Sequence, residues 1–286
     1  MASLKEIKAR ISSVSSTLKI TQAMKMVASA KLRKAQKMVG GLDAYKTALY
    51  AILGSLKAYL AQSPLAKPSA GSKVAVVVFS SHTALCGSYN ANIFKALEKE
   101  IGRLTSEGKA VVVYPVGEKV AKMSRKAGYD LCNDFVGCAD KLSYDDMAAL
   151  AQYMIDRFTA GEFGAVELLY MHYHSAARQS VEVQTWLPVS GDIPGSDARQ
   201  VDPDLIVEPS AEEVASGLLP LAMRTDMYAT LLSSNASENA CRMIAMQTAS
   251  DNAQELLQQL MLTYNKQRQQ VITEELTDIS NGKLGV

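Results

Sequence analysis

The first sixty residues repeat apolar side chains at alternating spacings of three and four residues. Ten of the twelve positions in this series are apolar; the full series is Leu4, Ile7, Ile11, Val14, Leu18, Thr21, Lys25, Ala28, Leu32, Ala35, Val39 and Leu42. A mean spacing of about 3.5 residues over this many turns is typical of a coiled-coil seam. Because Pro64 cannot continue a helix, the pattern predicts one N-terminal coiled-coil helix over residues 1–62.

The last third of the chain repeats the same spacing. Its seam consists of Met243, Met246, Ser250, Ala253, Leu257, Leu260, Tyr264, Gln267 and Val271. Ser210 and Glu213 form a capping-box pattern at its start, and Pro220 soon after predicts a kink or a restart of the helix. We therefore expect a C-terminal coiled-coil helix over residues 210–286 that pairs antiparallel with the N-terminal helix.

The middle of the chain has a different pattern, of short β-branched runs alternating with helical stretches. Such alternation is typical of βαβ units whose strands are buried on both faces. It predicts an inserted, Rossmann-like α/β domain over residues 70–190 and the fold class α/β. The expected order is a strand at 74–79, a helix near 91–104, a strand at 111–116, a helix at 147–158 capped by Ser143, a hairpin of strands 166–174 and 181–187 at one side of the sheet, and a loop over 190–209.

The net charge of +1 hides a strong asymmetry. Residues 1–40 carry nine lysines and arginines against one glutamate, a net charge of +8, and the remainder of the chain carries −7. The basic segment indicates an acidic partner, which is nucleic acid, a membrane surface or an acidic protein; a solvated lysine-rich face is the alternative. Nucleic acid is a weaker match than the charge suggests, because no aromatic side chains are interleaved with the cations, and an acidic protein fits at least as well. The longest strongly apolar run, Val74 to Phe79, is far shorter than the roughly 20 residues of a membrane span.

Candidate catalytic chemistry is sparse. Neither a P-loop nor a G-x-G-x-x-G motif occurs. The loop Ser80–Gly87 holds Ser, His and Cys close together, but adjacency in sequence does not place a base against a nucleophile, so a turn is the favoured interpretation. His172 and His174 share one strand face, which allows a metal or pH role; with no cysteine or carboxylate at evident ligand spacing, we interpret them as ordinary sheet residues. No metal or cofactor is predicted.

Both ends of the chain resemble one known family. The segment Ile20-Thr-Gln-Ala-Met-Lys-Met-Val-Ala28 is similar to the N-terminal helix of the γ subunit of F-type ATP synthase. Arg242-Met-Ile-Ala-Met246, Asp251-Asn-Ala253 and Tyr264-Asn-Lys-Gln-Arg-Gln-Gln-Val-Ile-Thr-Glu-Glu-Leu276 resemble its C-terminal helix. The resemblance covers essentially the whole chain.

The resemblance implies a rotor without catalytic residues. In the family the coiled coil stands inside the hexamer of α and β subunits, and the globular part joins the ε subunit and the c-subunit ring. Proton flow turns the ring and the rotor, which forces each β subunit through its catalytic states in turn. The implied location is peripheral, at the cytoplasmic face of the bacterial inner membrane, with no membrane span of its own and no nucleic-acid partner.

The resemblance also implies rotor–stator contact residues. Met24 and Lys25 match family positions near an acidic lever of the β subunit, and Arg242 matches an arginine on the facing helix. Arg268 and Gln269 match residues that hydrogen-bond a β-subunit loop, and Thr273 lies one turn beyond. One departure is His82-Thr83-Ala84, where the family usually has Asp-Arg-Gly, so the contacts of this loop do not carry over.

Two other classes of function stay open from the residues alone. A coiled-coil adaptor or chaperone with an α/β head would explain the long helices equally well, but not the motifs at the two ends. A small-molecule enzyme would bind its substrate at the carboxyl ends of the strands of the α/β domain.

Overall fold

The computed structural model describes residues 3–189 and 207–282. In chain order the elements are α1 (Leu4–Ser55), α2 (Lys57–Leu60), β1 (Lys73–Phe79), α3 (Tyr89–Ser106), β2 (Ala110–Val116), α4 (Glu118–Ala127), α5 (Cys138–Lys141), α6 (Tyr144–Thr159), β3 (Phe163–Tyr173), β4 (Gln179–Leu187) and α7 (Ala211–Gly282). Most of the loop expected at 190–209 lies outside the described residues. The domain boundaries 1–62, 70–190 and 210–286 stay a prediction.

A four-stranded sheet with the order β2-β1-β3-β4 forms the centre of the α/β domain. β1 pairs in parallel with both β2 and β3, and β4 pairs antiparallel with β3 at the edge. The predicted βαβ unit and the edge hairpin are therefore confirmed. β1 is buried on both faces because successive side chains of a strand point to opposite sides and each side is covered by helices.

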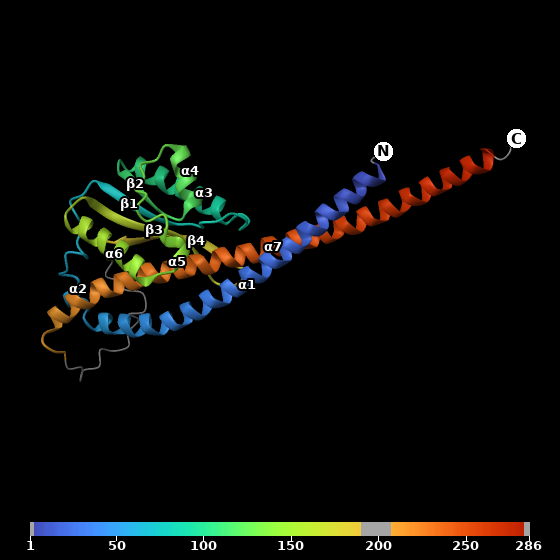
Figure 1. Cartoon of the computed structure of the whole chain (residues 1–286). Coiled ribbons are helices and arrows are strands. Elements are labelled where there is room, and N and C mark those ends of the chain that lie inside the picture. The colour runs from blue at the N-terminus through green and yellow to red at the C-terminus, as the bar shows by residue number, and fades with distance from the viewer. Residues whose placement is uncertain (1–2, 190–206, 283–286) are drawn as a thin grey trace. The chain divides into compact units, whose positions relative to one another are not determined.

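Helices cover both faces of the sheet (Figure 1), and each face has its own apolar core. Val74, Val76 and Val78 of β1 pack with α3 and α4 on one face. The alternate residues of β1 pack on the other face with α6 and with the segments of α1 and α7 around Leu53 and Leu219. The inserted domain thus shares one of its cores with the helices that precede and follow it.

Local signals explain where several helices begin. The Ser143 hydroxyl accepts a hydrogen bond from the Asp146 N–H at the start of α6, as its capping pattern predicts. The Ser210 hydroxyl does the same for the Glu213 N–H at the start of α7. Of the kink or restart expected at Pro220, the restart is wrong, because α7 continues through this proline; the kink stays a prediction. Neighbouring Leu219 and Ala222 are buried, so tertiary packing outweighs one lost backbone bond.

The described chain forms two compact units. The larger comprises Ala30–Cys241 and includes the sheet domain; the smaller comprises α1 up to Ser29 and α7 from Arg242 onward. Within the smaller unit the two helices run antiparallel side by side (Figure 1). Among the described residues, none of the helices combines the length and the apolar character that crossing a bilayer demands.

Candidate functional site

The paired helices of the smaller unit, which we call the helix pair, bury the seam that the spacing predicts. Every seam position from Leu4 to Ala28 on α1 is buried or half-buried, and so is every seam position from Met243 to Val271 on α7. Positions between them are mostly exposed. The coiled-coil interpretation is confirmed for this unit.

A buried polar pair sets the register of the two helices. The Ser250 hydroxyl lies 2.8 Å from the Thr21 hydroxyl, and both side chains are buried within the seam. Because the two seams have matching spacings in opposite directions, this contact places Leu18 level with Ala253 and Lys25 level with Met246. A polar pair at a single seam level favours one register over its alternatives, since a slip would leave both hydroxyls without this partner.

Three of the expected contact residues lie in one stretch of the helix pair. Met24 and Lys25 are half-buried on α1. Arg242 of α7 is 9% exposed, and it lies one helical turn from Met246, the residue level with Lys25. The structure therefore brings two cations, Lys25 and Arg242, to neighbouring levels of the pair.

The other three expected residues lie about 39–47 Å further along α7 than Arg242, at a rise of 1.5 Å per residue. Arg268, Gln269 and Thr273 are all exposed. The Thr273 hydroxyl donates to the Gln269 carbonyl oxygen at 2.9 Å, within the helix itself. The guanidinium and amide groups of Arg268 and Gln269 thus point away from the seam, toward solvent.

The end of α7 also exposes apolar side chains that the seam analysis missed. Ile272, Leu276 and Ile279 are 47%, 62% and 64% exposed. In the register set by Thr21 and Ser250, the α7 residues beyond Val271 have no facing residue on α1, which begins at Leu4. The signal in the sequence was that apolar residues continue after the regular seam has ended. We call residues 268–279 the α7 end.

Comparison with known proteins assigns the family. The family model described as ATP synthase matches residues 3–284. The ATP synthase gamma chain of Parabacteroides distasonis is 45% identical over 284 residues, covering 99% of this chain and 98% of the relative. That of Phocaeicola vulgatus is 46% identical over 289 residues, covering 99% and 100%. The chain belongs to the ATP synthase γ-chain family. Its function is that of the central-stalk rotor subunit, and the comparisons support this over a coiled-coil adaptor or chaperone.

Solved structures of γ-type stalks have the same fold. A chain of the Tetrahymena thermophila mitochondrial ATP synthase central stalk and c ring has a TM-score of 0.56 at 27% identity, covering 81% of this chain and 99% of that one. A chain of the Euglena gracilis mitochondrial ATP synthase has a TM-score of 0.66 at 18% identity, covering 98% and 93%. Long N- and C-terminal helices with an inserted α/β domain are thus shared across these stalks.

The loop that departs from the γ-family pattern is a hydrogen-bonded turn. The Ser81 hydroxyl donates to the Thr83 carbonyl oxygen at 2.7 Å, and the Ser81 N–H donates to Asn90 Oδ1 at 3.2 Å. Cys86 is buried and His82 is exposed. In the described part of the chain, no hydrogen bond joins His82 to Ser81 or Cys86, so the loop does not form the nucleophile and base pair considered from the sequence.

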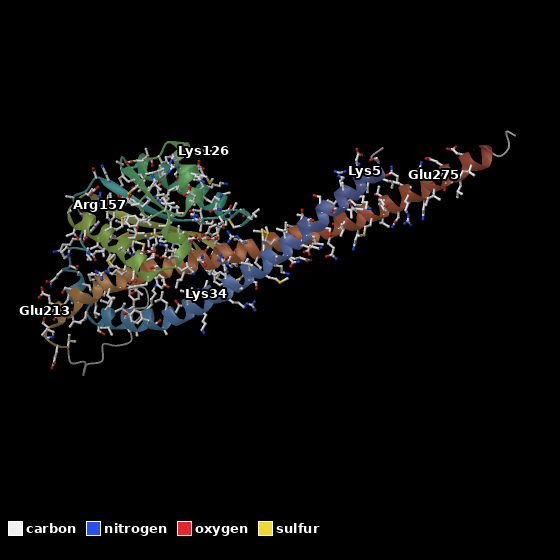
Figure 2. All side chains as sticks on the ribbon, in the orientation of Figure 1. Lys5, Lys34, Lys126, Arg157, Glu213 and Glu275 are labelled. Atoms are coloured by element: carbon white, nitrogen blue, oxygen red, sulfur yellow. The ribbon has the colours of Figure 1, made fainter. Side chains whose placement is uncertain are left out.

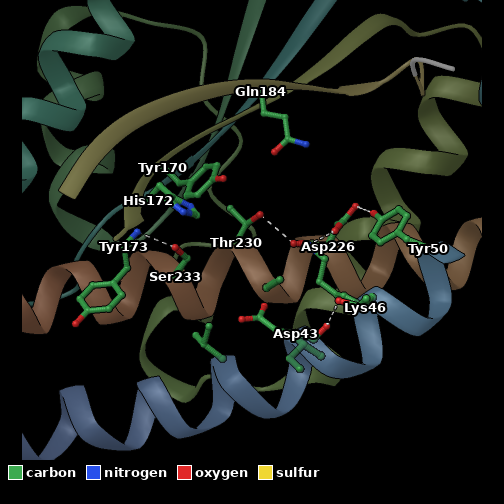
Figure 3. A pocket seen from close by; sticks show the side chains of 14 residues that line it. Asp43, Lys46, Tyr50, Tyr170, His172, Tyr173, Gln184, Asp226, Thr230 and Ser233 are labelled. Atoms are coloured by element: carbon green, nitrogen blue, oxygen red, sulfur yellow. Dashed lines mark hydrogen bonds and ion pairs between the residues drawn. The ribbon is translucent and has the colours of Figure 1, made fainter. Parts of the chain in front are cut away.

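A cavity of about 470 Å³ lies between α1, α7 and the sheet of the larger unit (Figure 3). Lys46 Nζ lies 2.7 Å from Asp226 Oδ1, and the Tyr50 hydroxyl donates to the same carboxylate. Burial and the Asp226 carboxylate raise the pKa of Tyr50, so its phenol stays protonated. This ion pair and hydrogen bond tie α1 to α7 within the larger unit, and Asp43 adds a second carboxylate to the lining of the cavity.

Proposed function

We propose that the helix pair transmits torque to the hexamer of α and β subunits, while the α/β domain joins the ε subunit and the c-subunit ring. The family and the named c-ring assemblies of its structural neighbours support these partners. The α7 end is the single observation that supports the mechanism most: it exposes a cation, an amide and three large apolar side chains without a facing helix from this chain. Such a surface is typical of a protein–protein contact.

The proposed mechanism depends on asymmetry. One helix pair presents a different surface to each of three chemically equivalent β subunits, so each subunit has a different contact energy with the rotor. A difference in contact energy between two conformations shifts their populations. Rotation of the pair then changes which β subunit is driven to bind substrates, to form ATP or to release it, and the rotor itself contributes no catalytic residue.

The positive charges of the helix pair support its proposed contact with an acidic part of the β subunit. Lys25 and Arg242 would face an acidic lever of the β subunit, and the exposed cations of the helix pair would add to this attraction: Lys5, Lys8, Arg10 and Lys19. Figure 2 shows Lys5 near the start of α1. Opposite charges across such an interface chiefly affect its specificity and rate of formation. The complex would lie at the cytoplasmic face of the bacterial inner membrane, with this chain peripheral.

Arg268 and Gln269 test the proposed contact at the α7 end. We expect the double variant Arg268→Ala, Gln269→Ala to lengthen one rotational dwell, because truncating charged interface groups whose partners stay buried costs about 2–5 kcal/mol. Assembly is expected to be unaffected, since both side chains lie off the seam. The measurement is single-molecule rotation of the reconstituted hexamer with this chain.

The control variant removes a cation and an amide elsewhere: Lys99→Ala with Asn92→Ala, both exposed on α3. It is expected to rotate like the parent chain. Unchanged dwell times and torque in the Arg268, Gln269 variant would remove these two residues from the mechanism.

A further inference from the structure

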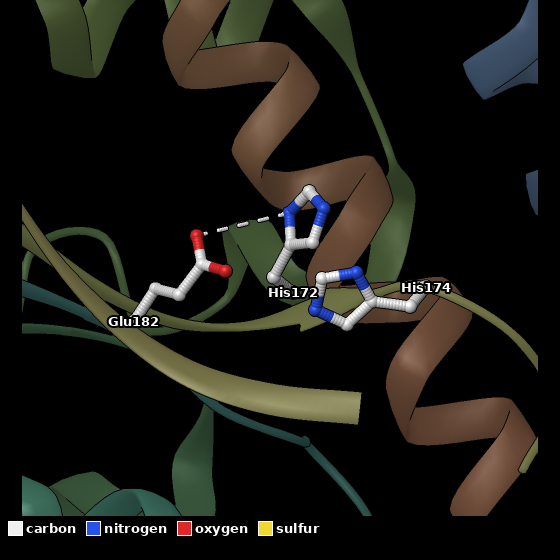
Figure 4. Close-up of side chains that lie close together, drawn as sticks. All are labelled: His172, His174 and Glu182. Carbon is white, nitrogen blue, oxygen red and sulfur yellow. Dashed lines mark ion pairs between the residues drawn. The ribbon is translucent and has the colours of Figure 1, made fainter. Parts of the chain in front are cut away.

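Two histidines and a glutamate meet at the edge hairpin of the sheet (Figure 4). His172 is on β3, His174 follows the end of that strand, and Glu182 is on β4. Side chains two residues apart on a strand share a face, and the register pairs His172 with Ser180 and Tyr170 with Glu182. One ligand atom from each of His172, His174 and Glu182 lies within 4.8 Å of the other two.

The histidines present nitrogen atoms to this space. His172 Nδ1 is buried and has no hydrogen-bond partner within the described residues, and it lies 3.9 Å from Glu182 Oε2. The rings of His172 and His174 are 4.7 Å apart between centroids, edge to face. A buried ring nitrogen without a partner loses its hydration with no compensating bond, which is unfavourable unless another ligand occupies the position.

Neighbouring hydroxyls hold the carboxylate. The Tyr170 hydroxyl donates to Glu182 Oε2 at 3.2 Å, and the Ser180 hydroxyl lies 3.2 Å from Oε1. The Ser180 hydroxyl also lies 2.8 Å from His174 Nε2. Outer partners of this kind orient carboxylate and imidazole ligands in metal sites.

We propose that His172, His174 and Glu182 bind a divalent transition-metal ion, with Zn²⁺ the best match. Two imidazoles and one carboxylate are a typical zinc ligand set, which leaves a fourth position for water. At metal–ligand bonds of about 2.0–2.1 Å, tetrahedral ligand atoms are about 3.4 Å apart, so the site closes by small side-chain rotations. The ion would join the end of β3 to the edge strand β4. This proposal does not depend on the rotor function.

The proposal predicts one-to-one zinc binding by the full-length chain. The chain is treated with a chelator and titrated with Zn²⁺ by calorimetry. His172→Gln, His174→Gln and Glu182→Gln are each expected to weaken binding at least about tenfold, because loss of even an outer partner costs about 10–100-fold in metal affinity. Tyr170→Phe removes only an outer partner, so it is expected to weaken zinc binding less than loss of a ligand does, by about tenfold.

His82→Gln is the matched control, because His82 is the third of only three histidines and lies in the loop after β1. It is expected to bind zinc like the parent chain. The four free cysteines are present in every variant, so binding through thiols would persist when all three ligands are replaced. His174 is exposed, so its substitution leaves the packing intact even if replacement of His172 disturbs it.

The sole tryptophan gives an independent readout. Trp186 lies four residues beyond Glu182 on β4, about 13 Å along the strand. Cu²⁺ at the site is expected to quench its fluorescence in the parent chain and in His82→Gln, but much less in the variant lacking all three ligands. Absence of zinc binding by the parent chain, or binding and quenching that survive replacement of all three residues, would overturn the proposal.

Discussion

At the scale of single residues, Glu167 is a buried carboxylate in the sheet domain with one unpaired oxygen among the described residues. It lies on β3, one of the inner strands, and is 5% exposed. Arg103 contacts it at 3.0 Å and also contacts Glu100 at 2.5 Å, while Glu167 Oε2 has no hydrogen-bond partner in the described structure. Burial and the nearby Glu100 charge raise the pKa of Glu167 to about 6, in spite of Arg103.

This raised pKa predicts a pH-dependent stability. Because the folded chain binds the proton of Glu167 more tightly than the unfolded chain, its contribution is fully present below about pH 4.5 and is lost as the pH rises through about 6. Glu167→Gln keeps the side chain neutral, so we expect about 1–2 kcal/mol of added stability at pH 7–8, since one pKa unit corresponds to about 1.4 kcal/mol. Denaturant unfolding between pH 4 and 8 measures it. Equal stability of variant and parent at pH 8 would contradict the expectation.

Two glycines predict opposite responses to the same substitution. Gly40 lies inside α1 with open space around an added Cβ, so Gly40→Ala is expected to stabilise the chain by about 0.8–1.0 kcal/mol. At Gly164 an added Cβ would overlap the carbonyl oxygen of Gly71, where the two backbones cross. Gly164→Ala is therefore expected to destabilise the folded chain by more than about 1 kcal/mol. Thermal unfolding of both variants checks the pair, and a shift of equal sign in both would refute the argument.

The sequence predicted residues in the helix pair better than residues in the sheet. Seam positions such as Leu18 and Ala253 follow from spacing alone, because a coiled coil repeats one local environment. Glu182 was not connected with His172 and His174, because their proximity depends on the register of two strands, which spacing along the chain does not contain.

At the scale of elements, the helix pair depends on the register set by Thr21 and Ser250. This register predicts that Leu18→Cys and Ala253→Cys form a disulfide in a background whose four native cysteines are replaced by serine. A disulfide needs Cα atoms about 4.4–6.8 Å apart, which only level seam positions provide. Non-reducing electrophoresis after mild oxidation measures the cross-link.

The control pair is Leu18→Cys with Leu257→Cys, which is one helical turn out of level. It is expected to cross-link poorly. Preferential formation of this second disulfide would show that the two helices pair in another register, and the level assigned to Lys25 and Arg242 would then be wrong.

Element prediction succeeded where the pattern was long and failed where it was short. The helices around Ala91–Leu104 and Met147–Phe158 were predicted because they lie between clear strands or carry a cap. The ten-residue helix α4 was not predicted, because its few buried positions give only a short repeat. The restart expected at Pro220 did not occur, because packing of the surrounding turns holds the helix.

At the scale of the whole molecule, this γ-family chain is the rotor subunit of the central stalk. A rotor needs helices held to each other more firmly than to the stator. The buried seam and the Thr21–Ser250 contact hold the helix pair together. The side chains expected to touch the hexamer are exposed or half-buried, except Arg242, which is 9% exposed. Rotation therefore breaks contacts with the hexamer and preserves those within the chain.

The most direct measurement is rotation observed on this chain during ATP hydrolysis. Lys126 is exposed on α4, so Lys126→Cys in the background without native cysteines carries a probe, and the hexamer of α and β subunits is anchored to a surface. If this chain is the rotor, the probe turns in one direction when ATP is added and stops when hydrolysis is inhibited. A probe that stays fixed while the same complexes hydrolyse ATP would contradict it.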